Sequence, residues 1–76
     1  MKKTLRQMKI GESGKIIEVN GSGDVKRRMI DLGITPGVYI LLKKYAPLGD
    51  PMEVRVRGYN VALRKSEAEN IVVEVE

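Results

Sequence analysis

The side chains that most often carry out chemistry in proteins are scarce in this chain of 76 residues. It has no histidine and no cysteine, so the commonest general base, the thiolate nucleophile and the usual protein ligands of iron and zinc are missing. Its serines, Ser13, Ser22 and Ser66, lie in expected turns or helix caps, where hydrogen bonds to the nearby backbone explain them. We therefore expect no catalytic residues, no metal site, no cofactor and no enzymatic activity.

The carboxylates are also poorly arranged for chemistry, because they are spread singly along the chain. No two of them share an apolar setting that would raise the pKa of one for acid–base catalysis. The segment 21–23 (GSG) lacks the rest of a phosphate-binding motif, and Asp24 after it would repel a phosphate. We interpret it as a turn and a helix cap. A hard cation could be held only loosely by two pairs, Glu67 with Glu69 and Glu74 with Glu76.

Basic side chains form one candidate binding surface. The chain carries 14 basic and 10 acidic residues, and its net charge of +4 permits contact with nucleic acid or acidic protein without requiring either. A small basic SH3-like module that binds nucleic acid is therefore the alternative hypothesis. The scarcity of aromatic residues that could stack on bases weighs against it. The only aromatic residues are Tyr39, Tyr45 and Tyr59. The basic residues concerned are Lys26, Arg27 and Arg28 in an expected helix, and Arg55, Arg57 and Arg64 in an expected hairpin.

The segment APLGDP, residues 46–51, forms the second candidate surface. Leu48 stands between Pro47 and Gly49, at a point where the chain is expected to be exposed. Two prolines restrict the loop, so that it loses little conformational entropy when it docks onto a partner. The alternative, in which Leu48 folds back over one end of the domain, stays open at this stage.

The elements that must position these residues are mainly strands. Apolar residues between turn signals predict strands over 14–20 and 38–45, a hairpin over 52–64 and a last strand over 71–76. One helix is predicted over Asp24–Leu32, with Asp24 as its N-cap and Gly33 as a left-handed cap at its end. Short helical turns are expected over 4–8 and 66–70, with the capping pairs Thr4–Gln7 and Ser66–Glu69.

The side chains of the strands can be assigned to two faces. The hairpin is expected to turn at Gly58-Tyr59, because glycine tolerates a positive φ. This register places Arg55 and Arg57 on the polar face, and its opposing pairs are Val56 with Val61, Val54 with Leu63 and Glu53 with Arg64. In the strand 38–45, Tyr39 and Tyr45 are expected on the face opposite to Ile40 and Leu42.

A chain of this length forms one domain, residues 1–76, and a sheet with one buried face must curl to protect its edges. We therefore expect an all-β fold, a small SH3-like five-stranded barrel with one α-helix inserted near residues 24–32 and short helical turns. No segment approaches the ~20 apolar residues needed to cross a bilayer. The lack of cysteine favours a cytoplasmic location.

Three stretches of the sequence resemble one known family. They are MIDLGITPG at 29–37, APLGDP at 46–51 and RGYNVALRKSEA at 57–68. Together with TLRQMKIGESGKI near the N-terminus, they make the chain similar to the ferrous iron transport protein A (FeoA) family over almost its whole length. The resemblance implies an SH3-like barrel with an early inserted helix. It also implies a small cytosolic accessory of FeoB, the membrane ferrous-iron transporter with a cytosolic G-protein domain, which it would bind to support iron uptake.

We therefore expect this protein to act by contact with that transporter, with no nucleic-acid partner and no insertion into the membrane. It could also pair weakly with a second copy of itself. The expected contact surfaces are the loop 46–51 and the helix before Gly33. The candidate contact residues are Pro47, Leu48 and Asp50 in the loop, Tyr45 before it, Arg28 and Met29 in the helix, and Arg55 and Arg57 in the hairpin.

Overall fold

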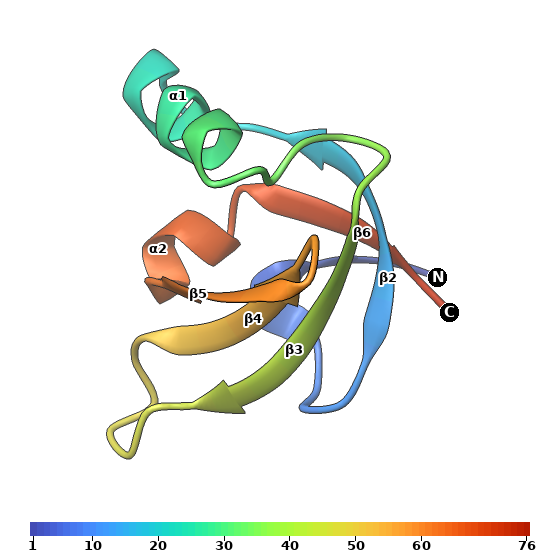
Figure 1. The fold of residues 1–76 in the computed structure, drawn as a ribbon, viewed down its shortest axis with the longest axis vertical. Helices are drawn as coiled ribbons and strands as arrows, with labels where there is room; N and C mark the ends of the chain where they lie inside the picture. The colour runs from blue at the N-terminus through green and yellow to red at the C-terminus, as the bar shows by residue number, and fades with distance from the viewer.

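All strands of the computed structural model, which describes residues 1–76, belong to one antiparallel sheet (Figure 1). Its order is β1-β6-β2-β3-β4-β5, so that β1 and β5 are its two ends and no ladder joins them. The prediction of an all-β, SH3-like fold is confirmed. The predicted barrel is not closed, because the sheet is curled but its two end strands are not paired with each other. The strands are β1 (Lys2–Thr4), β2 (Ser13–Val19), β3 (Tyr39–Tyr45), β4 (Met52–Val56), β5 (Tyr59–Leu63) and β6 (Ile71–Val75).

The strand β1 is the sixth strand, and the sequence did not predict it. It pairs with β6, with Lys2 opposite Glu74 and Thr4 opposite Val72. Its three residues carry no alternating pattern of their own, so their extended form depends on pairing with β6. Because β6 ends where β1 begins, the two ends of the chain lie side by side (Figure 1).

The concave side of the sheet encloses one apolar core. No polar or charged residue is buried, and alternate residues of β4 and β6 point inward as the sequence predicted. Each buried Leu or Ile contributes about 1.5–3 kcal/mol relative to leaving it exposed. The core residues are Leu5, Met8, Ile16, Met29, Ile34, Ile40, Leu42, Met52, Val54, Val56, Leu63, Ala68, Ile71, Val73 and Val75.

Two irregularities in the ladders bend the sheet. The register of β2 against β6 shifts between Ile16 and Glu18, and that of β3 against β4 shifts between Leu42 and Lys44. The second shift moves Tyr45 onto the core side, where it lies opposite the buried Met52. Its hydroxyl donates to the carbonyl oxygen of Met8 at 3.4 Å. The prediction that Tyr45 shares a face with Tyr39 is therefore wrong.

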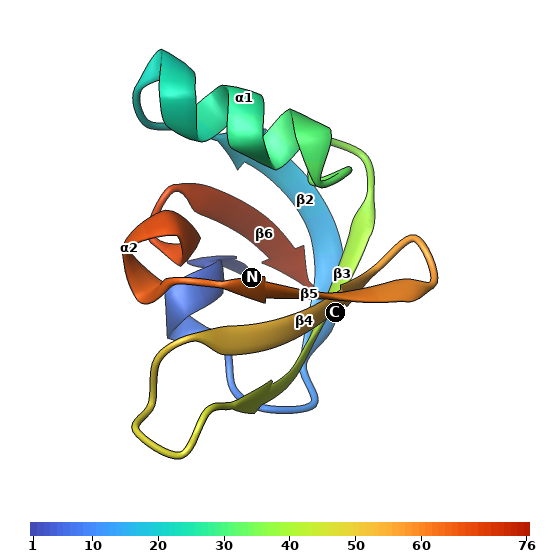
Figure 2. The same ribbon diagram turned by 60° about the vertical axis from the view of Figure 1, so that its left-hand side comes forward.

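The helix α1 (Gly23–Asp31) lies at one end of the curled sheet, beyond the end of β2 (Figure 2). The Ser22 hydroxyl accepts a hydrogen bond from the Val25 N–H at 3.4 Å, so Ser22 is the N-cap and the assignment of Asp24 is corrected. The predicted cap at Gly33 is confirmed by its φ of +82° and by its N–H, which donates to the carbonyl of Ile30. Met29 is the only fully buried residue of α1.

Two short helices complete the fold. The 3₁₀ helix η1 (Leu5–Gln7) confirms the expected turn near the N-terminus, because the Gln7 side chain accepts from the Thr4 N–H at 2.9 Å. The helix α2 (Lys65–Ala68) begins one residue earlier than expected. Its capping carboxylate is Glu67, which accepts from the Arg64 N–H at 3.0 Å, and not Glu69 as predicted.

The hairpin of β4 and β5 turns at Arg57-Gly58, one residue earlier than predicted. Val54 lies opposite Val61, and Glu53 lies opposite Ala62, so the expected pairing of Glu53 with Arg64 is wrong. Both turn residues have positive φ, +50° and +87°, as in a type I′ turn, which favours glycine at its second central position. The slip changes each pairing by two residues, so the assignment of side chains to faces still holds.

Glu67 also joins the two α-helices, because the Arg28 guanidinium of α1 pairs with its carboxylate. Partial burial alone would raise the pKa of Glu67. Hydrogen bonds from the Arg64 N–H and from Arg28, together with the charges of both arginines, outweigh burial and hold this pKa below its ordinary value of 4.5.

Arg57→Asn should stabilise the fold. A non-glycine residue in the left-handed region costs roughly 1–2 kcal/mol, and asparagine tolerates that region better than arginine. We expect the free energy of unfolding, measured in urea, to rise by about 0.5–1 kcal/mol. Arg55→Asn removes the same charge from an extended position and should bring no gain. An Arg57→Asn variant that is no more stable than the unmodified protein would contradict the account of the turn.

Glu67→Gln should flatten the dependence of stability on pH under acid conditions. Because folding lowers the pKa of Glu67, its carboxylate stabilises the fold above about pH 4.5, and this contribution is lost as the pH falls through the folded-state pKa. Urea unfolding at a series of acid pH values should show a smaller decline for the variant. Arg28→Met removes one of the two donors to Glu67. Its decline in stability at acid pH should lie between that of the unmodified protein and that of Glu67→Gln. A difference in stability that is the same at every pH would argue against this linkage.

Candidate partner-binding surface

The loop 46–51 between β3 and β4 is closed by its own backbone. The Gly49 N–H donates to the carbonyl of Ala46 at 2.7 Å, and the Ala46 N–H donates to the carbonyl of Pro51 at 2.9 Å. Leu48 lies at the tip and is 96% exposed. The alternative in which Leu48 folds back over one end of the domain is therefore excluded for this structure.

The base of the loop is fastened to α2. The Lys65 N–H donates to the Asp50 carboxylate at 3.1 Å, and the Lys65 ammonium lies 5.6 Å from the centre of the Tyr45 ring. Asp50 and Tyr45, both predicted as contact residues, thus hold the loop in place. Because its base and its turn are both fixed, Leu48 is presented on a preorganised support.

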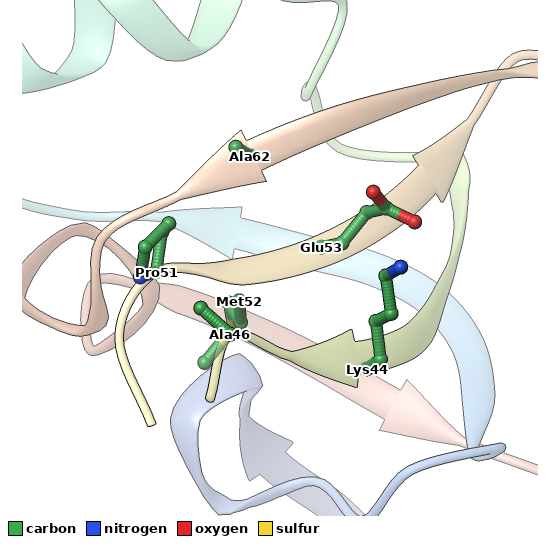
Figure 3. A pocket seen from close by; sticks show the side chains of 6 residues that line it. All are labelled: Lys44, Ala46, Pro51, Met52, Glu53 and Ala62. Carbon is green, nitrogen blue, oxygen red and sulfur yellow. The ribbon is translucent and has the colours of Figure 1, made fainter. Parts of the chain in front are cut away.

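A shallow hollow lies beside the loop, with a volume of about 120 Å³ (Figure 3). Ala46, Pro51 and Ala62 form an apolar part of its wall. Lys44 and Glu53, which are directly opposite each other in β3 and β4, form a charged part. An apolar side chain of a partner could enter this hollow while the partner also covers Leu48.

The other predicted contact residues do not join this surface. Met29 is 0% exposed, so its assignment as a contact residue is wrong for this conformation. Arg28 forms an ion pair with Glu67 within the protein. Arg55 and Arg57 lie toward the other end of β4, where they line a different hollow together with Tyr39.

Basic residues that the sequence singles out line three different hollows. Lys26 lines a hollow beside α1, Arg64 lines one with Asp50 and Pro51, and Arg55 and Arg57 line a third. The basic residues of the nucleic-acid hypothesis therefore do not meet in one hollow, and only Arg55 and Arg57 share one.

No group of three His, Cys, Asp or Glu side chains lies close enough together to hold a metal ion. Glu67 and Glu69 are each engaged by an arginine, and Glu74 is paired with the N-terminal amine. None of the helices has the length and apolar character that crossing a membrane requires.

One surface feature escaped the sequence analysis. Ile30 of α1 is 62% exposed and lines a hollow of about 150 Å³ together with Val19, Ile34 and Pro36. The signal that could have revealed it is the helical spacing of Val25, Met29 and Leu32, which leaves Ile30 off the buried stripe.

Comparison with known proteins covers nearly the whole chain. Residues 3–75 match the model of the FeoA domain. The chain is 35% identical over 71 residues to an Fe(2+) transport protein A/Fe(2+) transporter FeoB fusion protein of Porphyromonas gingivalis. The match includes 93% of this chain but only 8% of the length of that relative.

Solved structures agree with this match. The FeoA-like protein from Clostridium acetobutylicum has a TM-score of 0.89 and 40% identity, covering 97% of this chain and 86% of that protein. FeoA of Stenotrophomonas maltophilia, an SH3 domain protein solved in complex with zinc, has a TM-score of 0.81 and 29% identity, with coverage of 95% and 89%. The chain therefore belongs to the FeoA family, which takes part in ferrous iron transport.

Proposed function

We propose that this protein supports ferrous iron uptake by binding, through the loop 46–51, to the cytosolic G-protein region of a FeoB-type transporter. The observation that carries the proposal is the exposure of Leu48 at the tip of a loop that is fixed at its turn and at its base. A large apolar side chain that is 96% exposed gains free energy when a partner covers it.

The choice of partner is supported by the fused relative. In Porphyromonas gingivalis, protein A of ferrous iron transport and the transporter FeoB are parts of one chain. Segments joined in one polypeptide are held at a high effective concentration, which favours contact between them. Where the two are separate chains, a binding surface must supply the association.

The role that we assign is contact with the transporter and not ligation of its cargo. The chain has no histidine or cysteine, which are the side chains best suited to hold iron. Full burial of one leucine contributes about 1.5–3 kcal/mol, so Leu48 can account for a substantial part of a moderate affinity.

Leu48→Asp should weaken the complex with the purified cytosolic region of FeoB by at least about tenfold, because it replaces an apolar anchor with a charge that the interface must desolvate. Binding is measured by calorimetry with that region in its GDP-bound, GTP-bound and nucleotide-free forms. Ile30→Asp is the matched control, since it places the same charge at another exposed apolar residue, and it should leave the affinity unchanged.

Two results would count against the proposal. If the unmodified chain binds in none of the nucleotide states, the transporter region is not its partner. If Ile30→Asp abolishes binding and Leu48→Asp does not, the contact lies on α1 and the role of the loop is wrong.

A further inference from the structure

A second surface lies on the outer face of β3 and β4, toward the end of β4 that is remote from Leu48. It is an open hollow of about 290 Å³, lined by Tyr39, Leu41, Arg55 and Arg57 and by Ser13 of β2. We propose that this hollow binds an acidic segment of a partner protein, with carboxylates on the two arginines and an apolar side chain against Tyr39 and Leu41. The proposal does not depend on what the loop 46–51 binds.

The positive charge of this surface is not compensated within the protein. The four ion pairs of the structure join Met1 with Glu74, Lys3 with Glu12, Arg6 with Glu69 and Arg28 with Glu67. Arg55 and Arg57 take part in none of them, and neither does Lys15, which lies opposite Tyr39 in the adjoining strand. An anionic partner would therefore meet cations that need not first give up a carboxylate.

The two arginines are held in position. One guanidinium nitrogen of Arg55 donates to the carbonyl of Gly58 at 3.1 Å. The stem of Arg57 packs against Gly33, where an added Cβ would lie 3.1 Å from its Cδ. The hairpin tip is fixed to the end of α1, because the Tyr59 hydroxyl donates to the carbonyl of Leu32 at 3.2 Å. Binding would then require little further ordering of these side chains.

The backbone of Arg57 has an unfavourable conformation for an arginine. Its φ of +50° makes it the only residue other than glycine with a positive φ, in a turn where asparagine or glycine would be less strained. Its packing on Gly33 offsets part of this cost. A strained backbone that carries an uncompensated guanidinium into a hollow points to a function of that side chain in binding.

The chemistry of the hollow favours an acidic peptide over a nucleic acid. The planar guanidinium of arginine matches a carboxylate in geometry. Each arginine has five N–H donors, and the structure shows only one hydrogen bond from the Arg55 guanidinium, to the carbonyl of Gly58. The floor offers the half-buried Leu41 and Tyr39, a residue that is 57% exposed, and both suit an apolar side chain between two acidic ones. Nucleic-acid surfaces of this type need several stacking residues, and Tyr39 is the only aromatic residue that lines this hollow.

The test is a titration of the isotope-labelled full chain, followed by NMR, with a short peptide that alternates glutamate and leucine. The same peptide with glutamine in place of glutamate is the uncharged control. We expect saturable shifts of the Tyr39, Leu41 and Arg57 amides and of the Arg55 side-chain Nε–H, and none with the control peptide. Arg57→Asn, whose fold should be at least as stable as that of the unmodified protein, should weaken binding about fivefold.

A matched variant separates a specific site from general attraction. Arg27→Asn removes the same charge from α1, where Arg27 is exposed and takes part in no ion pair, and should leave the affinity within about twofold. An equal loss in both variants, or shifts spread over α1 and the hollow alike, would overturn the proposal. Tighter binding of single-stranded RNA at the same residues would overturn it in favour of a nucleic-acid surface. None of these results would bear on Leu48, which lies in the loop 46–51 and does not line this hollow.

Discussion

The constraint on which this structure depends is that one narrow sheet must enclose a core of 15 apolar residues. The register shifts at Ile16/Glu18 and Leu42/Lys44 supply the bending that this requires. β2 and β6 approach so closely at Gly14 that an added Cβ would lie 2.2 Å from the carbonyl oxygen of Glu74. Since the concave side is occupied by the core, the residues free to meet other molecules lie at strand ends and on the outer face. The loop 46–51 and the arginine hollow are two such places.

Much of this fold could be predicted because its cues are local. Alternation fixed the inward residues of β4 and β6, and the spacing of Val25, Met29 and Leu32 located α1. The errors arose where the presence of a strand or its register depends on pairing with a distant segment or on the residues of a turn. β1 exists only because β6 offers it an edge, and the hairpin register follows from Gly58 being the second turn residue instead of the first. A bulge cannot be read from alternation, so the side taken by Tyr45 was missed.

The candidate surfaces were predictable to a lesser degree. The neighbours Pro47 and Gly49 indicated an exposed Leu48 but left open that it folds back over the domain, and the structure decides for exposure. The contacts of Lys65 with Asp50 and Tyr45 could not be predicted, because they join segments far apart in the chain. Met29 was misassigned because a residue at helical spacing is more often core than contact. The positive φ of Arg57 was missed with the hairpin register, although it distinguishes this arginine from the other cations on the surface.

The pairing of β1 with β6 also determines how the domain can be attached to something larger. The Val75 N–H donates to the carbonyl of Met1 at 2.9 Å, so a polypeptide joined at either end would leave from nearly the same point. The loop 46–51 points away from that point in both views (Figures 1 and 2). A tether at either terminus would therefore leave the domain at a point remote from the loop 46–51 and would not cover it. A circular permutant that joins the two ends through a short linker would need little added chain and would keep the sheet intact.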